Sequence, residues 1–65
     1  MKDYQQRVIA EKEDLDGKIE RLATFMTGET FEALPGAERS DMQLQIGAMQ
    51  EYSDILANRI GRFDS

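Results

Sequence analysis

Two tyrosines and a group of basic residues are the side chains in this sequence whose types could recognise a small ligand. Tyr4, Arg7 and Lys12 lie near the start of the chain, and Tyr52 and Arg59 lie near its end. An arginine guanidinium can hold a phosphate through two parallel hydrogen bonds, and a tyrosine ring can stack on a base. These residues fit a small phosphorylated nucleotide, provided that the fold brings the two ends of the chain together.

The first third of the chain has the periodicity of an amphipathic helix that runs from Asp3 to Met26. Its apolar residues recur in steps of three and four, at Val8, Leu15, Ile19, Leu22 and Met26. Lys12 falls on the same stripe, where an apolar residue would be expected. A single apolar stripe on a long helix predicts that the helix packs against one partner helix along that side.

The connection "TGETFEALPGAERSD" predicts a break and a short helical turn. We expect Gly28 to end the first helix in the left-handed conformation that glycine adopts readily. Residues 29–34 are expected to form one turn that carries Phe31 and Leu34. Two starts are open for the second helix: Pro35, which suits a first helical turn, or Ser40 with Asp41 as an N-cap.

The second helix is expected to run to about Phe63. Its stripe is Met42, Ile46, Met49, Ser53, Leu56, Ile60 and Phe63. Two helices joined by a short connection pack antiparallel, and matching the apolar pairs, such as Val8 with Leu56, also sets Lys12 opposite Ser53. We therefore expect an all-α, antiparallel two-helix hairpin that forms one domain over residues 1–65.

This hairpin would gather both tyrosines and most of the basic residues at its open end. Five of the eight basic residues lie there, namely Lys2, Arg7, Lys12, Arg59 and Arg62. The alternative for Lys12 is structural: its stem can lie on the core while its amine reaches water, or it can set the register. Its partner would then be Glu11, Asp16, Glu51 or Asp54. The tyrosines could equally be interface aromatics.

The composition removes several classes of function. The chain has 65 residues, no cysteine and no histidine, so the usual zinc and haem ligands and the usual catalytic nucleophiles and bases are missing. The net charge of −5 argues against general nucleic-acid binding. No apolar pocket is evident that would raise the pKa of a carboxyl group for catalysis. We expect no catalysis, no cofactor, no metal and no membrane-spanning segment.

A hairpin this small leaves apolar surface uncovered. Tyr4, Ile9 and Phe25 flank the first stripe, and Ala48, Tyr52 and Ile55 flank the second. Chains of this length bury a marginal core and often need oligomerisation for stability. We therefore expect a homo-oligomer in which other protomers cover these residues.

Two segments, "DYQQRVIAEKEDLDGKIERLATF" and "MQEYSDILANRIGRF", resemble a family of small phage and prophage proteins named after a gene product of a crAss-like phage. The shared pattern is Asp-aromatic-x-x-Arg-Val, then Glu-Lys, heptad Leu and Ile, Met-x-x-Tyr-Ser-x-x-Leu and a closing Arg-Ile. The resemblance implies a helical phage accessory protein that acts in the host bacterial cytoplasm. Its pattern covers the five candidate ligand residues Tyr4, Arg7, Lys12, Tyr52 and Arg59.

Phage proteins of similar size and architecture include sponges, which sequester the cyclic nucleotide messengers of bacterial defence systems such as CBASS and Thoeris. By that analogy, our leading hypothesis is a non-catalytic sponge for a cyclic or otherwise phosphorylated nucleotide. Two alternatives stay open. One is a protein-binding adaptor or inhibitor that uses the Ile9, Phe25 and Ile55 face. The other is a structural helical oligomer without a small ligand.

Overall fold

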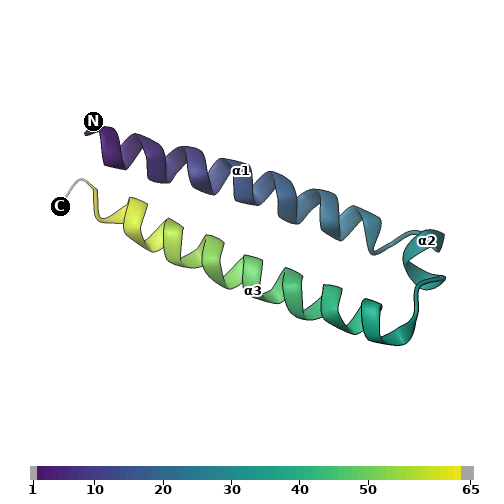
Figure 1. Cartoon of the computed structure of the whole chain (residues 1–65). Coiled ribbons are helices and arrows are strands. Elements are labelled where there is room, and N and C mark those ends of the chain that lie inside the picture. Colours follow the sequence, from purple (N-terminus) through teal and green to yellow (C-terminus); the bar gives the residue numbers. More distant parts are fainter. Residues whose placement is uncertain (1, 64–65) are drawn as a thin grey trace.

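The protein is an antiparallel pair of long helices joined by one short helical turn. The computed structural model describes residues 2–63, in the order α1 (Asp3–Phe25), α2 (Glu29–Glu32) and α3 (Gly36–Gly61). The start of α1 and the end of α3 lie together, and α2 closes the opposite end (Figure 1). The molecule measures 47 × 15 × 14 Å. The expected all-helical hairpin is confirmed.

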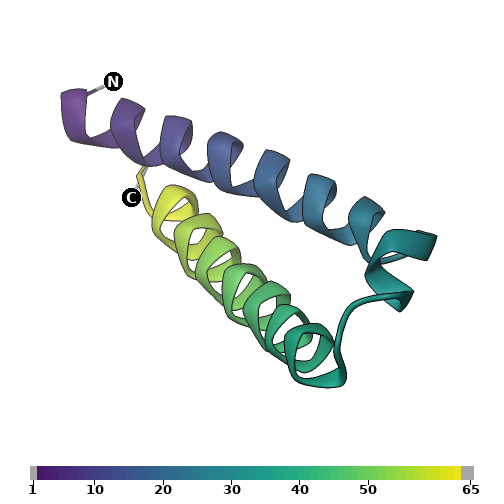
Figure 2. The ribbon, with the colours of Figure 1, turned by 45° about the vertical axis from the view of Figure 1, so that its right-hand side comes forward.

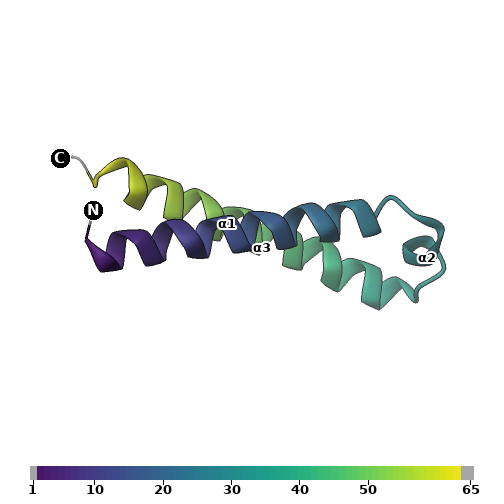
Figure 3. The same ribbon diagram turned by 90° about the horizontal axis from the view of Figure 1, so that it is seen from above.

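The two long helices cross at an angle when viewed from above (Figure 3). They diverge toward α2, so that the closest approach lies nearer the chain ends (Figure 2). The core follows this geometry: Val8, Leu15 and Leu56 are buried together, with Ile19, Met49, Ile60 and Phe63 packed around them. Leu56 is fully buried, at 0% exposure. Val8 and Leu56 thus share the core layer that the apolar register predicts.

The turn after α1 differs from the expected one. Gly28 has φ −97° and ψ 170°, so its predicted left-handed conformation is wrong. The reason is that α2 begins at the next residue and Gly28 serves as its extended N-cap. The last turn of α1 closes instead through tighter bonds: the Thr27 hydroxyl donates to the Thr24 carbonyl at 2.7 Å, and the Gly28 N–H donates to the Phe25 carbonyl at 3.1 Å.

The short helix α2 fills the wide end of the hairpin. It presents Phe31, which is 8% exposed. Phe31 packs edge-on against Phe25 with 6.3 Å between ring centroids, a favourable geometry for an aromatic pair. Pro35 then stands directly before the first residue of α3, so the start near Pro35 is confirmed and Ser40 and Asp41 lie inside the helix. No helix within residues 2–63 is long and apolar enough to cross a membrane.

We predict that Leu56→Ala destabilises the hairpin by about 2–5 kcal/mol, because it removes a fully buried side chain and leaves a cavity. A domain of this length has roughly 3–10 kcal/mol of stability to lose, so the change removes a large fraction of the total and should lower the melting temperature markedly. Thermal unfolding followed by circular dichroism measures the effect. The control is Asn58→Ala, two residues further along and exposed, which should melt at or slightly above the parent temperature. Equal melting of Leu56→Ala and the parent would contradict this account of the core.

Candidate ligand-binding end and polar layer

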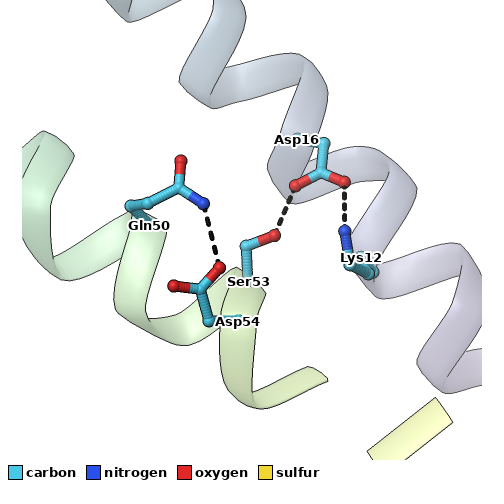
Figure 4. Close-up of polar contacts among 5 residues, drawn as sticks. All are labelled: Lys12, Asp16, Gln50, Ser53 and Asp54. Carbon is cyan, nitrogen blue, oxygen red and sulfur yellow. Dashed lines mark hydrogen bonds and ion pairs between the residues drawn. The ribbon is translucent and has the colours of Figure 1, made fainter. Parts of the chain in front are cut away.

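A carboxylate joins the two long helices where the apolar stripes are interrupted. The Ser53 hydroxyl of α3 donates to Oδ1 of Asp16 on α1 at 2.5 Å, and Lys12 Nζ donates to Oδ2 of the same group at 2.7 Å (Figure 4). Ser53 is 2% exposed. A buried hydroxyl without a partner is costly, so Asp16 removes that cost. The predicted shared layer of Lys12 and Ser53 exists, but Asp16 connects its two members.

Two neighbouring side chains stabilise the charged form of the Asp16 carboxyl group. The hydrogen bond from Lys12 is the larger influence, and that from Ser53 is the second; together they hold the pKa of Asp16 below its ordinary value. Asp16 remains partly hydrated, since 45% of its side chain is exposed. The layer is thus a half-buried ion pair completed by one buried hydroxyl.

The ammonium of Lys12 is therefore already held. Asp16 is one of the four carboxylates that a structural role for Lys12 predicted as its partner. Lys12 Nζ and Asp16 Oδ2 form this ion pair at 2.7 Å. The Lys12 side chain is 27% exposed, as expected for a stem that lies along the core with its amine near water. A second contact from Lys12 to a ligand stays a prediction, but the hairpin alone gives this residue a sufficient structural role.

The other four candidate residues remain exposed: Tyr4, Arg7 and Arg59 lie near the open end, and Tyr52 lies further inside α3, next to Ser53 of the polar layer. Tyr4 is 49% and Tyr52 is 42% exposed, and Arg7 and Arg59 are also exposed. Arg7 follows Tyr4 by about one helical turn, and Arg59 follows Tyr52 by about two, so each pair shares one side of its helix. No residue in the described part of the chain forms an ion pair with either arginine.

An aromatic contact ties the two helix ends together. Tyr4 packs edge-on against Phe63, with 6.0 Å between ring centroids. Phe63 comes one turn after Arg59, so the contact places the start of α1 beside the basic end of α3. Sequence periodicity placed Phe63 on the inward stripe but did not indicate its pairing with Tyr4, because the helix ends at Gly61 and the chain turns there.

The candidate residues do not enclose a ligand within one hairpin. The hollow found on the surface lies further along α1 and is lined by Gly17, Glu20, Arg21 and Thr24. None of the five candidate residues lines it. Across residues 2–63, no three acidic side chains come together in a way that could hold a metal ion. Exposed groups on a rod can bind a ligand well only when a second surface closes over them, so a site here would need another protomer.

The fold and these side chains define a class: a small helical hairpin with a basic and aromatic end. The chain belongs to the Sequestin family, whose model matches residues 2–62. This match confirms the family resemblance seen in the sequence, while origin from a crAss-like phage stays a prediction. No curated protein and no solved structure matches the chain. The family suggests a binding protein rather than a catalyst.

The lowered pKa of Asp16 predicts an acid-dependent stability. Because the folded-state pKa lies below the unfolded one, the contribution of Asp16 is complete above about pH 4 and is lost as the pH falls through the folded value. Asp16→Asn removes this titration, since an amide can accept from Ser53 but does not ionise. The melting temperature of Asp16→Asn should therefore fall less steeply than that of the parent between pH 5 and pH 2.

The matched control is Asp14→Asn. Asp14 also pairs with a lysine four residues away, Lys18, at 3.2 Å, but this pair is exposed and has no contact to α3. Exposed pairs contribute little to stability, so Asp14→Asn should follow the acid profile of the parent. Parallel profiles for the parent and Asp16→Asn would show that the polar layer does not stabilise the hairpin.

Proposed function

We propose that this protein is a non-catalytic binding protein that sequesters a cyclic or otherwise phosphorylated nucleotide messenger. The observation that carries the proposal is that Tyr4, Arg7, Tyr52 and Arg59 stay exposed, and that among the described residues neither arginine forms an ion pair; Tyr4 also packs edge-on against Phe63. The family name, Sequestin, points to sequestration. Binding alone removes a signal, so no bond has to break.

The chemistry of these four residues matches the two parts of a nucleotide. Arginine offers a planar fork of donors for phosphate oxygens, and tyrosine offers a face for stacking on a base. The rest of the chain is acidic, with a formal net charge of −5. A local basic end on an acidic protein favours a small anion over a long polyanion, because extended nucleic acid would be repelled beyond that end. We assign Lys12 to the polar layer.

This proposal implies that the ligands are the nucleotide messengers of antiphage systems of the CBASS and Thoeris type. A phage protein would meet them in the cytoplasm of its host. Since a single hairpin offers these residues on a convex surface, the proposal includes a homo-oligomer in which a second protomer completes each site.

The adaptor alternative has less support from the surface. Of its three proposed anchors, Ile9 is half-buried, Phe25 is 37% exposed beside Phe31, and Ile55 is 56% exposed. Amphipathic helices that dock into grooves present anchors at three or four successive turns. Phe25 lies on α1 and Ile55 on α3, so the three residues do not form such a run on one helix.

We predict that the protein retains a cyclic nucleotide and releases it unchanged. The protein is incubated with a panel of cyclic mono-, di- and trinucleotides, washed, and heated, and the supernatant is analysed by chromatography. The bound nucleotide should raise the melting temperature, because it binds the folded state only. A hydrolysed or linear product would instead indicate an enzyme, and no retention of any nucleotide would favour a structural oligomer.

Arg7→Gln should weaken the retained nucleotide by about tenfold to a hundredfold, the cost of a lost charge-assisted hydrogen bond of roughly 1.5–3 kcal/mol. Calorimetric titration gives the affinity, and circular dichroism checks the fold. Arg21→Gln is the matched control, since Arg21 is also exposed on α1 but lies four turns away. Lys12→Met should leave the affinity unchanged. If Lys12→Met loses affinity with an intact fold and Arg7→Gln does not, the ligand contact belongs to Lys12.

A further inference from the structure

A second apolar stripe runs along α3, on a side that the hairpin does not use. We call it the outer strip; its members are Leu44, Ala48, Tyr52 and Ile55. They recur in steps of four, four and three, and lie roughly 120° around the helix from the inward stripe. Leu44 is 73%, Ile55 is 56% and Tyr52 is 42% exposed. Leu44 is the most exposed large apolar side chain in the described residues, and the sequence periodicity alone did not single it out.

The amount of exposed surface has the size that a dimer interface requires. A monomeric protein of 7.4 kDa is expected to expose about 4,200 Å², whereas this hairpin exposes 4874 Å². The excess is about 670 Å², close to the roughly 800 Å² that each partner contributes to a standard interface. The elongated shape, 47 × 15 × 14 Å, accounts for this excess, and it means that the hairpin exposes enough surface for one interface beside its own core.

We infer that the outer strip is the contact face of a two-fold symmetric homodimer in which the α3 helices of two copies pack antiparallel. An antiparallel pair brings together residues whose position numbers have a constant sum. Here Leu44 faces Ile55 of the second copy and Ala48 faces Tyr52, with sums of 99 and 100. Two-fold symmetry makes each contact occur twice.

The charges at the two ends of the strip fit the same register. Asp41 lies at one end and Arg59 at the other, both on the side of the strip, and their position numbers also add to 100. Asp41 of one copy therefore faces Arg59 of the second, twice. A parallel arrangement would instead set Asp41 against Asp41 and Arg59 against Arg59, which repel. Glu51 lies roughly 60° around the helix from the centre line of the strip, so its charge falls at the rim of the proposed interface.

The dimer deepens the proposed function, which already includes a second protomer at each site, but it is argued from separate observations. It needs no ligand, and its test uses protein alone. Tyr52 belongs both to the strip and to the candidate ligand residues, and Arg59 lies at one end of the strip, whereas Arg7 lies on α1, outside it. A failed nucleotide experiment with Arg7→Gln thus leaves the dimer standing, and a failed dimer experiment leaves nucleotide retention to be judged by its own assay.

The first experiment is sedimentation equilibrium of the full chain at micromolar concentration. We expect a species of twice the 7.4 kDa protomer mass. Asp41→Arg or Arg59→Asp alone should weaken self-association by about tenfold or more, since two ion pairs become two repulsions. The double variant Asp41→Arg with Arg59→Asp should restore it, because the pairs reform with exchanged signs. A monomeric parent, or single variants that associate like the parent, would overturn the inference.

Cross-linking tests the direction of the helices. The chain contains no cysteine, so Leu44→Cys and Ile55→Cys introduce single reactive sites. In the antiparallel dimer, a mixture of the two variants oxidises to a covalent heterodimer, and neither variant cross-links by itself. Cross-linking of Leu44→Cys with itself, without a product in the mixture, would show a parallel pair and overturn the register. Circular dichroism of each variant confirms that α1 and α3 stay folded.

Discussion

A hairpin of two helices gives each helix only one neighbour, and this constraint governs the rest of the molecule. Each long helix can bury one stripe, so the shared core consists of Val8, Leu15 and Leu56, with Phe31 closing the wide end. Such a core is near the lower limit for a stable domain. Every residue that interrupts the stripe must therefore be compensated locally, and every apolar residue off the stripe is left for another surface to cover.

The polar layer shows how the interruption is compensated. An apolar residue at position 12 or 53 could stabilise the fold as well as an ion pair does, so the layer is better understood as a register device. The Ser53 hydroxyl donates to Asp16, and the same carboxylate neutralises Lys12. A shift of one helical turn between α1 and α3 would leave a buried hydroxyl without an acceptor and would separate Val8 from Leu56. Apolar contacts tolerate such slippage more readily, because they have no direction.

The periodicity of the apolar residues was enough to predict both helices and their antiparallel packing. It also predicted the layer that contains Lys12 and Ser53, because residues spaced three and four apart lie on the side of each helix that faces the other helix. It was not enough for Gly28, whose backbone depends on how soon the next helix starts. It named Asp16 among the possible partners of Lys12 but missed the hydrogen bond from Ser53 to Asp16, since a side chain that reaches across from beside the stripe leaves no periodic signal. Leu44 was overlooked for a related reason: once one stripe explains a helix, a second stripe on another side looks like scattered apolar residues.

The outer strip and the candidate ligand residues meet at Arg59, and their two roles are compatible. A guanidinium carries five N–H donors, and a carboxylate in a bidentate pair takes two of them. An Arg59 held by Asp41 of a second copy would keep three donors and would lose most of its freedom to rotate. Ordering this long side chain costs conformational entropy. Because the cost would already be met when the dimer forms, ligand binding would become more favourable. A nucleotide that binds such a fixed arginine would in turn stabilise the dimer, since coupling between two binding steps is reciprocal. Self-association and ligand capture would on this account reinforce one another through a single residue.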